Sequence, residues 1–203
     1  KLNKKNNSSR QAGLWAFEAL CVTMGRLFEP YVIHILPLLL ACFNSGESIR
    51  DAAFSAADAI MGQLSGQGVK LVLPSLLQAI DESDAWRTTA GAIDLLGAMA
   101  HCAPRQLSQC LPTVVPRLCA AVSEPHPKVR AAAEQSLGRI GEVIRNPEIK
   151  EISGTLLKAL SDPSYTAKAL QQLMDMAFVH AVDAPSLAII MPTLQRGLRS
   201  QVT

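Results

Sequence analysis

The sequence predicts an all-α fold, an α-solenoid of about five helical repeats whose terminal units are incomplete. Two observations support this prediction: a motif that recurs about every 40 residues, as in known repeat families, and a composition dominated by helix formers. The motif is anchored in turn at Pro37, Pro74, Pro116, Gly154 and Pro192. A nearly constant period of this length is typical of repeat architectures, in which each unit contacts mainly its neighbours.

The positions that follow each anchor share their chemistry from one unit to the next. Leucine stands at the second position after every anchor, at Leu39, Leu76, Leu118, Leu156 and Leu194. A small residue stands at the fifth position, at Cys42, Ala79, Ala121, Ala159 and Gly197. An apolar residue stands at the sixth position, at Phe43, Ile80, Val122, Leu160 and Leu198. We therefore expect each unit to bury the same surface.

The composition favours helices over strands. Hydrophobic residues make up 49% of the 203 residues, whereas aromatic residues make up only 4%. Alanine and leucine favour helices and permit close packing, and the β-branched and aromatic runs of a sheet are few.

Each unit is predicted to hold two helices joined by a polar turn. In the first unit, apolar residues recur at three- and four-residue steps, which places them on one helical face. They are Leu14, Phe17, Cys21, Met24 and Phe28. Pro30 suits a helix start, and Gly66 and Gly68 suit a helix end. The polar turns are expected at 44–46, 81–84, 123–127 and 161–164. This is the HEAT pattern.

The polar and basic residues 1–8 are predicted to form a disordered end or a loop between repeats, and residues 200–203 a tail. The HEAT array is predicted at 9–199, with units at roughly 9–29, 30–66, 67–103, 104–146, 147–183 and a partial unit at 184–199. Apolar helical faces without a partner at both ends lead us to expect a segment of a longer array.

Charge and cysteine usage narrow the classes of function. The formal net charge is +2, and the first ten residues hold four of the 19 basic side chains and no acid. A body this close to neutral argues against a long groove for naked nucleic acid. The five cysteines suit reduced thiols, and no signal peptide or membrane span is expected.

No catalytic, cofactor or metal site is predicted. The histidines are scattered, and Gly66, Gly68 and Lys70 lack the spacing of a phosphate-binding loop. The acids Asp81 and Asp84 are interpreted as solvated turn residues. We therefore expect no small-molecule substrate.

A basic residue stands 13 or 14 positions after each of the first four anchors. These residues, Arg50, Arg87, Arg130 and Lys168, are called the basic ladder here. One interpretation pairs them with turn acids, namely Glu47, Asp84, Glu124 and Asp162. The other makes the ladder, with Trp86, a ridge that binds phosphate or an acidic partner.

Several strings resemble a known family. They include 26–32 (Arg-Leu-Phe-Glu-Pro-Tyr-Val), 68–77, 86–88 (Trp-Arg-Thr), 95–100, 102–104, 146–149, 178–179 (Phe-Val) and 183–188. They resemble the central region of the general-control translational activator of the initiation factor two alpha kinase. That region is itself similar to the HEAT part of translation elongation factor three. The likeness covers nearly all of residues 10–199.

The resemblance implies a cytoplasmic, non-catalytic scaffold on ribosomes that promotes stress-activated phosphorylation of initiation factor two alpha during amino-acid starvation. It implies as partners the ribosome, an ATP-binding-cassette protein and, through other parts of the full-length protein, the kinase. One alternative is a HEAT adaptor that binds peptides or proteins in transport or phosphatase assemblies. Another is an enzyme with an unrecognised site.

Overall fold

The computed structural model describes the backbone of residues 2–200 and the side chains of residues 7–199. Throughout this part of the chain the regular structure is helical, as the sequence predicts. The chain divides into two compact units, one up to Gln106 and one from Leu107 onward, and each is described by itself.

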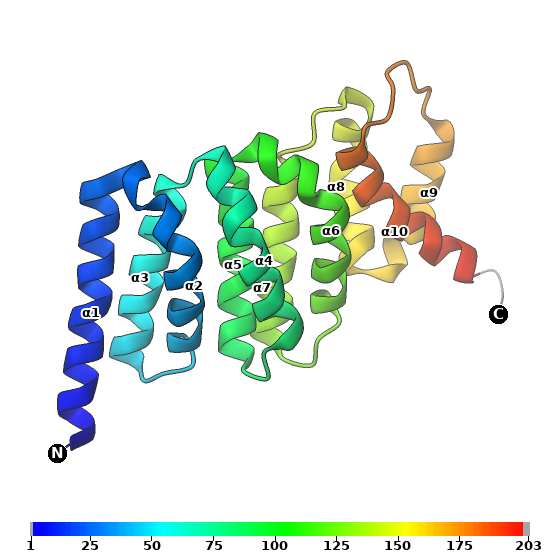
Figure 1. The fold of residues 1–203 in the computed structure, drawn as a ribbon. Helices are drawn as coiled ribbons and strands as arrows, with labels where there is room; N and C mark the ends of the chain where they lie inside the picture. Colours follow the sequence, from blue (N-terminus) through cyan, green and yellow to red (C-terminus); the bar gives the residue numbers. More distant parts are fainter. Residues whose placement is uncertain (1, 201–203) are drawn as a thin grey trace. The chain divides into compact units, whose positions relative to one another are not determined.

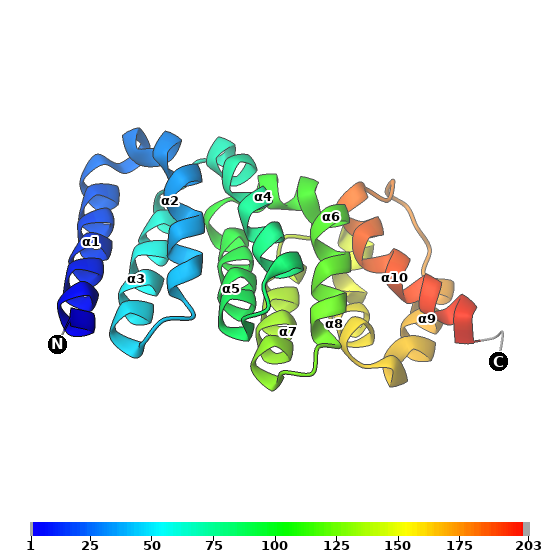
Figure 2. The ribbon, with the colours of Figure 1, turned by 60° about the horizontal axis from the view of Figure 1, so that its bottom comes forward.

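The first unit consists of antiparallel helices in two layers. Its elements are α1 (Leu2–Met24), the 3₁₀-helix η1 (Gly25–Phe28), α2 (Glu29–Cys42), α3 (Glu47–Gln63), α4 (Gly66–Glu82) and α5 (Trp86–Cys102). The helices α1, α3 and α5 pack side by side in one layer, and α2 and α4 form the other (Figures 1 and 2). The anchors Pro37 and Pro74 lie inside α2 and α4.

The core of this unit lies between the two layers. Its fully buried members include Leu36, Leu39, Leu76, Leu96 and Met99. Small residues bring the helices close together, because Ala53, Ala56 and Ala57 of α3 are completely buried. Gly91 of α5 faces the stacked rings of Phe43 and Phe54, whose centroids are 4.0 Å apart. The leucine column of the sequence therefore lies in the interior of the unit, whereas Cys42 and Ala79 of the small-residue column are only half-buried.

The second unit repeats the plan with shorter helices. Its elements are most of α6 (Pro104–Val122), α7 (Pro127–Gly141), α8 (Pro147–Ser161), η2 (Pro163–Tyr165), α9 (Thr166–Asp175) and α10 (Ala184–Ser200). The helix α8 packs against α7, α9 and α10, and α9 also packs against α10. Leu118 and Leu156, from the leucine column, are fully buried.

Two expectations differ from the structure at the ends of the chain. Residues 2–8 belong to α1 and are not a disordered end, because no glycine or proline interrupts the helix before Gly13 and helix propagation adds one hydrogen bond per residue. At the other end, Ser200 was expected in the tail but is the last residue of α10. The remaining tail residues, 201–203, lie outside the described residues, as does Lys1 at the N-terminal end.

Candidate functional site

The first two residues of the basic ladder lie in the first turns of α3 and α5, which pack together in the first unit. Arg50 forms an ion pair with the adjacent Asp51, with 3.5 Å between Nε and Oδ1. The guanidinium carbon of Arg87 lies 4.5 Å from the centroid of the Trp86 ring. Both Trp86 and Arg87 are half-buried, so this cation–π pair lies at the surface of the first unit.

The other two residues lie in the first turns of α7 and α9, in the second unit. Arg130 donates from Nη1 to the backbone oxygens of Glu124 (2.9 Å) and Pro125 (2.8 Å), and so caps the turn that follows α6. Lys168 is exposed. Arg130 is therefore used within the fold, whereas Lys168 faces solvent.

The expected pairing of the ladder with turn acids is wrong for Arg50 and Arg130. Arg50 bonds to Asp51 instead of Glu47, and Arg130 uses the backbone oxygen of Glu124 instead of its carboxylate. Asp162 accepts a hydrogen bond from the Ser164 N–H (2.9 Å), which keeps its pKa below the usual range. The backbone oxygens of the turn before α7 lie close to the start of that helix. Arg130 therefore binds them and not the Glu124 carboxylate.

Acidic residues at the starts of the first helices make the long-range links that sequence reasoning missed. The Glu29 carboxylate accepts hydrogen bonds from Ser65 Oγ (2.7 Å) and Ser65 N (3.1 Å), and Ser65 in turn caps α4. Glu148, at the start of α8, accepts from the backbone of Val179 (3.2 Å) and His180 (3.1 Å). Glu29 precedes Pro30, and Glu148 follows Pro147, each at a helix start. This neighbouring proline is the only signal in the sequence for these long-range links.

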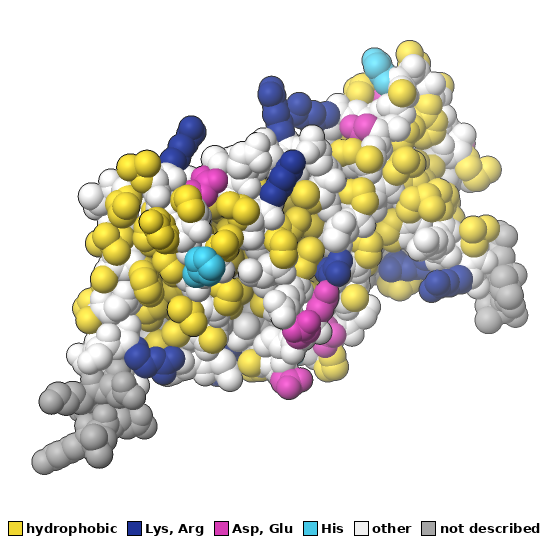
Figure 3. Space-filling view, in the orientation of Figure 1, with side chains coloured by type: hydrophobic (Ala, Val, Ile, Leu, Met, Phe, Trp, Pro, Cys, Tyr) yellow, Lys and Arg dark blue, Asp and Glu magenta, His cyan; other side chains and the backbone are white. Residues whose placement is uncertain are grey.

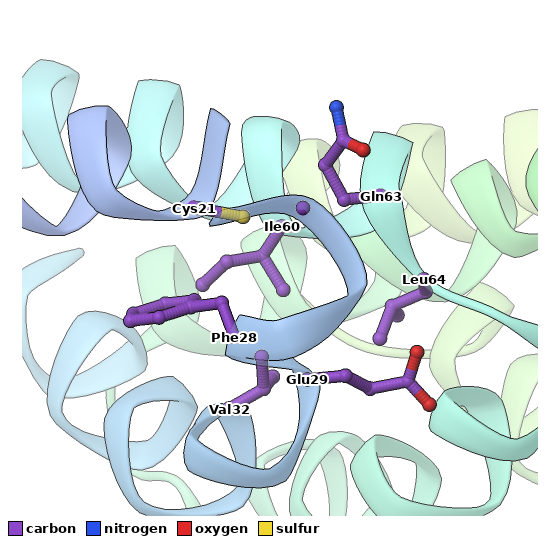
Figure 4. Close-up of a pocket in the computed structure, with 8 residues that line it drawn as sticks. Cys21, Phe28, Glu29, Val32, Ile60, Gln63 and Leu64 are labelled. Atoms are coloured by element: carbon purple, nitrogen blue, oxygen red, sulfur yellow. The ribbon is translucent and has the colours of Figure 1, made fainter. Parts of the chain in front are cut away.

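A small cavity lies where α1, η1, α2 and α3 meet (Figure 4). Phe28, Val32 and Ile60 line it below the thiol of Cys21, and its volume is about 10 Å³. This is space for about one water molecule, so the cavity cannot hold a small-molecule ligand. Burial raises the pKa of Cys21, whose thiol donates to the backbone oxygen of Ala59 at 3.6 Å.

A larger groove lies in the second unit and is called the α7–α8 groove here. Its volume is about 430 Å³, and it is open to solvent. It is lined by Glu134, Gly138, Leu157, Lys158, Ser161, Asp162 and Tyr165. Volumes of this size are found for ligand sites, but the lining here is more polar than that of a small-molecule pocket.

Apolar side chains are exposed on the first unit. Leu27, Tyr31 and Leu38, on η1 and α2, have exposed fractions of 75%, 56% and 59%. Figure 3 shows hydrophobic side chains gathered over α2 and α4. Contiguous exposed apolar area is typical of interaction surfaces, so this face of α2 is a candidate interaction surface.

The described residues hold no cluster of metal ligands and one run that is apolar enough for a membrane span. Among these side chains no group of three His, Cys, Asp or Glu residues comes together. The run Asn7–Cys42 is apolar and long enough to pass for a membrane span by length and composition, a test that buried core helices also pass. It is not one straight helix, because Gly25, with a φ of 53°, begins η1 between α1 and α2.

Comparison with known proteins defines the class of the chain. Residues 1–137 match the model of the EF3 N-terminal HEAT repeat, and residues 164–203 match the Elongation factor 3/GNC1 HEAT repeat. The chain belongs to the family of EF3 N-terminal HEAT repeats. The predicted fold class is thereby confirmed.

Within this class the chain is similar to proteins named GCN1. The mouse protein named "Stalled ribosome sensor GCN1" is 55% identical over 203 residues, 99% of this chain. The Saccharomyces cerevisiae "eIF-2-alpha kinase activator GCN1" is 43% identical over 98% of the chain. Elongation factor 3 of Gonapodya prolifera is 31% identical over 99% of the chain and 19% of its own length. The chain spans about 8% of the length of these GCN1 relatives. The predicted resemblance to the translational activator is confirmed.

Proposed function

We propose that the chain is a non-catalytic scaffold segment of a cytoplasmic, ribosome-associated translational activator that promotes stress-activated phosphorylation of initiation factor two alpha. The supporting observation is the 55% identity, over 99% of the chain, to a protein named as a stalled ribosome sensor. A relative from Dictyostelium discoideum, 52% identical, is named as an eIF-2-alpha kinase activator. Through such a segment the full-length protein would hold the ribosome, an ATP-binding-cassette partner and the kinase in one assembly.

The mechanism that we propose is recognition by rigid stacked helices. Within each unit, neighbouring helices are fixed by buried alanine and leucine contacts and by hydrogen bonds between distant parts of the chain, such as that from Ser65 to Glu29. Such a unit holds its surface residues in constant register, so several weak contacts add up on one large partner. The exposed apolar face of α2 would pack on another repeat of the full-length array. The division into repeat units at the predicted boundaries also remains part of this proposal.

The basic ladder supplies the contacts to be tested, and its four members are not equivalent. Arg130 and Arg50 have partners within the fold. Arg87, stacked on Trp86, and the exposed Lys168 are therefore the members that we propose to contact phosphate or an acidic partner.

The test is ribosome co-sedimentation of the full-length protein from amino-acid-starved cells, with Arg87→Glu and Lys168→Glu. We expect both variants to sediment less with ribosomes, and the loss to be larger at low salt. Lys150→Glu, which changes an exposed lysine outside the ladder, is the matched control. Unchanged sedimentation of both ladder variants would remove these residues from the interface. Absence of the wild-type protein from ribosomes and from complexes with the kinase would contradict the proposed function itself.

A further inference from the structure

The α7–α8 groove combines three features that recognise one kind of side chain. Glu134 on α7 and Asp162 at the end of α8 bring carboxylates to it from two different helices. Tyr165 of η2 contributes an aromatic ring. A planar cation that stacks on a ring and forms paired hydrogen bonds with a carboxylate matches this set, and that cation is the guanidinium of arginine.

The groove already holds one cation, the ammonium group of Lys158. The ammonium of Lys158 lies 5.8 Å from the centroid of the Tyr165 ring, at the outer limit of a cation–π contact. Lys158 is exposed and its side chain is flexible, so it can move aside. The same ring face is then available to a cation that fits better.

Gly138 lines the groove without a side chain and leaves it open on the α7 side. A Cβ atom built on Gly138 would meet no heavy atom within 4 Å, so the space above this glycine is open. One turn further along α7 the arrangement is different, because a Cβ on Gly141 would lie 2.4 Å from Leu157 Cδ1. The opening at Gly138 is therefore local, and the packing of α7 on α8 closes the groove beside it.

We propose that the α7–α8 groove binds an arginine side chain from a basic segment of a partner protein. Positive charges near the groove oppose the binding of a cation. Lys158 competes for the ring. Arg196 of α10 lies close enough to act on Asp162, but its guanidinium donates to the backbone oxygens of Ala159 and Leu160. Asp162 stays ionised because the Ser164 N–H holds its pKa below the usual range. The net charge of the chain is +2, so overall attraction cannot account for binding of a cationic peptide.

The experiment measures binding of fluorescein-labelled Gly-Arg-Gly-Arg-Gly to the full chain by fluorescence anisotropy at low ionic strength. The peptides with lysine or with glutamate in place of arginine are the comparisons. We expect the arginine peptide to bind most tightly and the glutamate peptide not to bind. In the ¹⁵N-labelled chain, the amide resonance of Gly138 should shift on addition of the arginine peptide.

Four variants test the site, and they do not all act in one direction. Glu134→Gln and Asp162→Asn should each weaken binding by about threefold to fivefold, as loss of an exposed ion pair does. Lys158→Gln should tighten it by about threefold, since a competing cation is removed. Gly138→Leu should abolish binding because it fills the open α7 side of the groove, and leucine is a better helix former than glycine, so the variant should fold.

The control is Glu142→Gln, which removes an exposed acid at the end of α7 outside the groove and should leave affinity unchanged. The proposal is overturned if the glutamate peptide binds as tightly as the arginine peptide, if Lys158→Gln weakens binding, or if Gly138→Leu leaves it unchanged. None of these results depends on ribosome binding. The peptide assay can therefore contradict arginine binding in the groove without contradicting the proposed function, and the reverse also holds.

Discussion

The carboxylate of Glu148 lies 2.8 Å from Nδ1 of His180, a residue 32 positions further along the chain. The same oxygen accepts hydrogen bonds from the backbone N–H groups of Val179 and His180. One side chain at the start of α8 thus holds the connection between α9 and α10. The hydrogen bond from the His180 side chain, with help from the backbone groups of Glu148, His180 and Val179 and against the effect of burial, lowers the pKa of Glu148 from 4.5 to about 2.

We predict that this connection loosens in acid. A carboxyl group whose pKa is lowered by folding contributes stability above its unfolded pKa, and the contribution is lost as the pH falls. For Glu148 the loss should occur between about 4.5 and about 2. Amide chemical shifts of Val179 and His180, followed by NMR from pH 6 to pH 1, should report a transition with a midpoint near 2.

In the same titration Glu148→Gln should remove the transition, because the side chain no longer ionises. Glu151→Gln, an exposed acid on the same helix, should leave it in place. A transition of Val179 with a midpoint near 4.5 would show that the carboxylate does not hold the connection.

The contact of Gly91 with the stacked rings leads to a second prediction. A Cβ on Gly91 would lie 2.4 Å from Phe43 Cδ2 and 3.0 Å from Phe54 Cζ. Gly91→Ala should therefore lower the free energy of unfolding by about 1–3 kcal/mol, as overpacking of a dense core does. In urea denaturation, Gly13→Ala should instead raise it by up to about 1 kcal/mol, because nothing lies within 4 Å of that Cβ and alanine favours the helix. Equal effects of the two substitutions would contradict the packing argument.

Ser65 links the start of α2 to the start of α4, and its replacement should cost more than the loss of an ordinary cap. Its hydroxyl accepts from the N–H groups of Gln67 and Gly68 and donates to Glu29. Ser65→Ala should lower the free energy of unfolding by about 1–2 kcal/mol, at the upper end for an N-cap residue. Ser55→Ala, which removes an exposed hydrogen bond to Glu18, should stay within about 0.5 kcal/mol of wild type in the same denaturation experiment.

The basic ladder should divide into structural and surface members. Arg130→Ala removes two hydrogen bonds to backbone oxygens and should lower the free energy of unfolding by about 1–2 kcal/mol. Lys168→Ala, at an exposed position, should change it by less than about 0.5 kcal/mol. Thermal denaturation of the two variants side by side checks this. If Arg130→Ala left the free energy of unfolding unchanged, Arg130 would again be a candidate binding residue.

Thiol reactivity should follow burial. Burial, opposed in part by Arg196, raises the pKa of Cys119 to about 11. At pH 8 its thiolate population, and hence its rate with iodoacetamide, should be about two orders of magnitude below that of an ordinary cysteine. Mass-spectrometric mapping of labelled peptides measures the rate, and the chain unfolded in guanidinium, where all five cysteines should react alike, is the control. Fast labelling of folded Cys119 would contradict the predicted burial effect.

The helices and the repeat were predictable because their signals are local. Leu39, Leu76, Leu118 and Leu156 recur at fixed distances from their anchors, and all four are fully buried in the structure. The expectation of disorder differs from the structure over residues 2–8, which belong to α1, because polar composition alone does not stop a helix that has already formed.

The amino-acid sequence by itself determined the all-α fold, the repeat period, the leucine interior and the family, since each is a pattern along the chain. Only the tertiary structure decided what the charged side chains do. Arg130 binds backbone oxygens, and Glu148 binds backbone N–H groups on a distant part of the chain. The α7–α8 groove likewise forms only when Glu134, Asp162 and Tyr165 meet. Every residue other than proline carries the same backbone donor and acceptor, so no sequence pattern identifies which of them a side chain will reach.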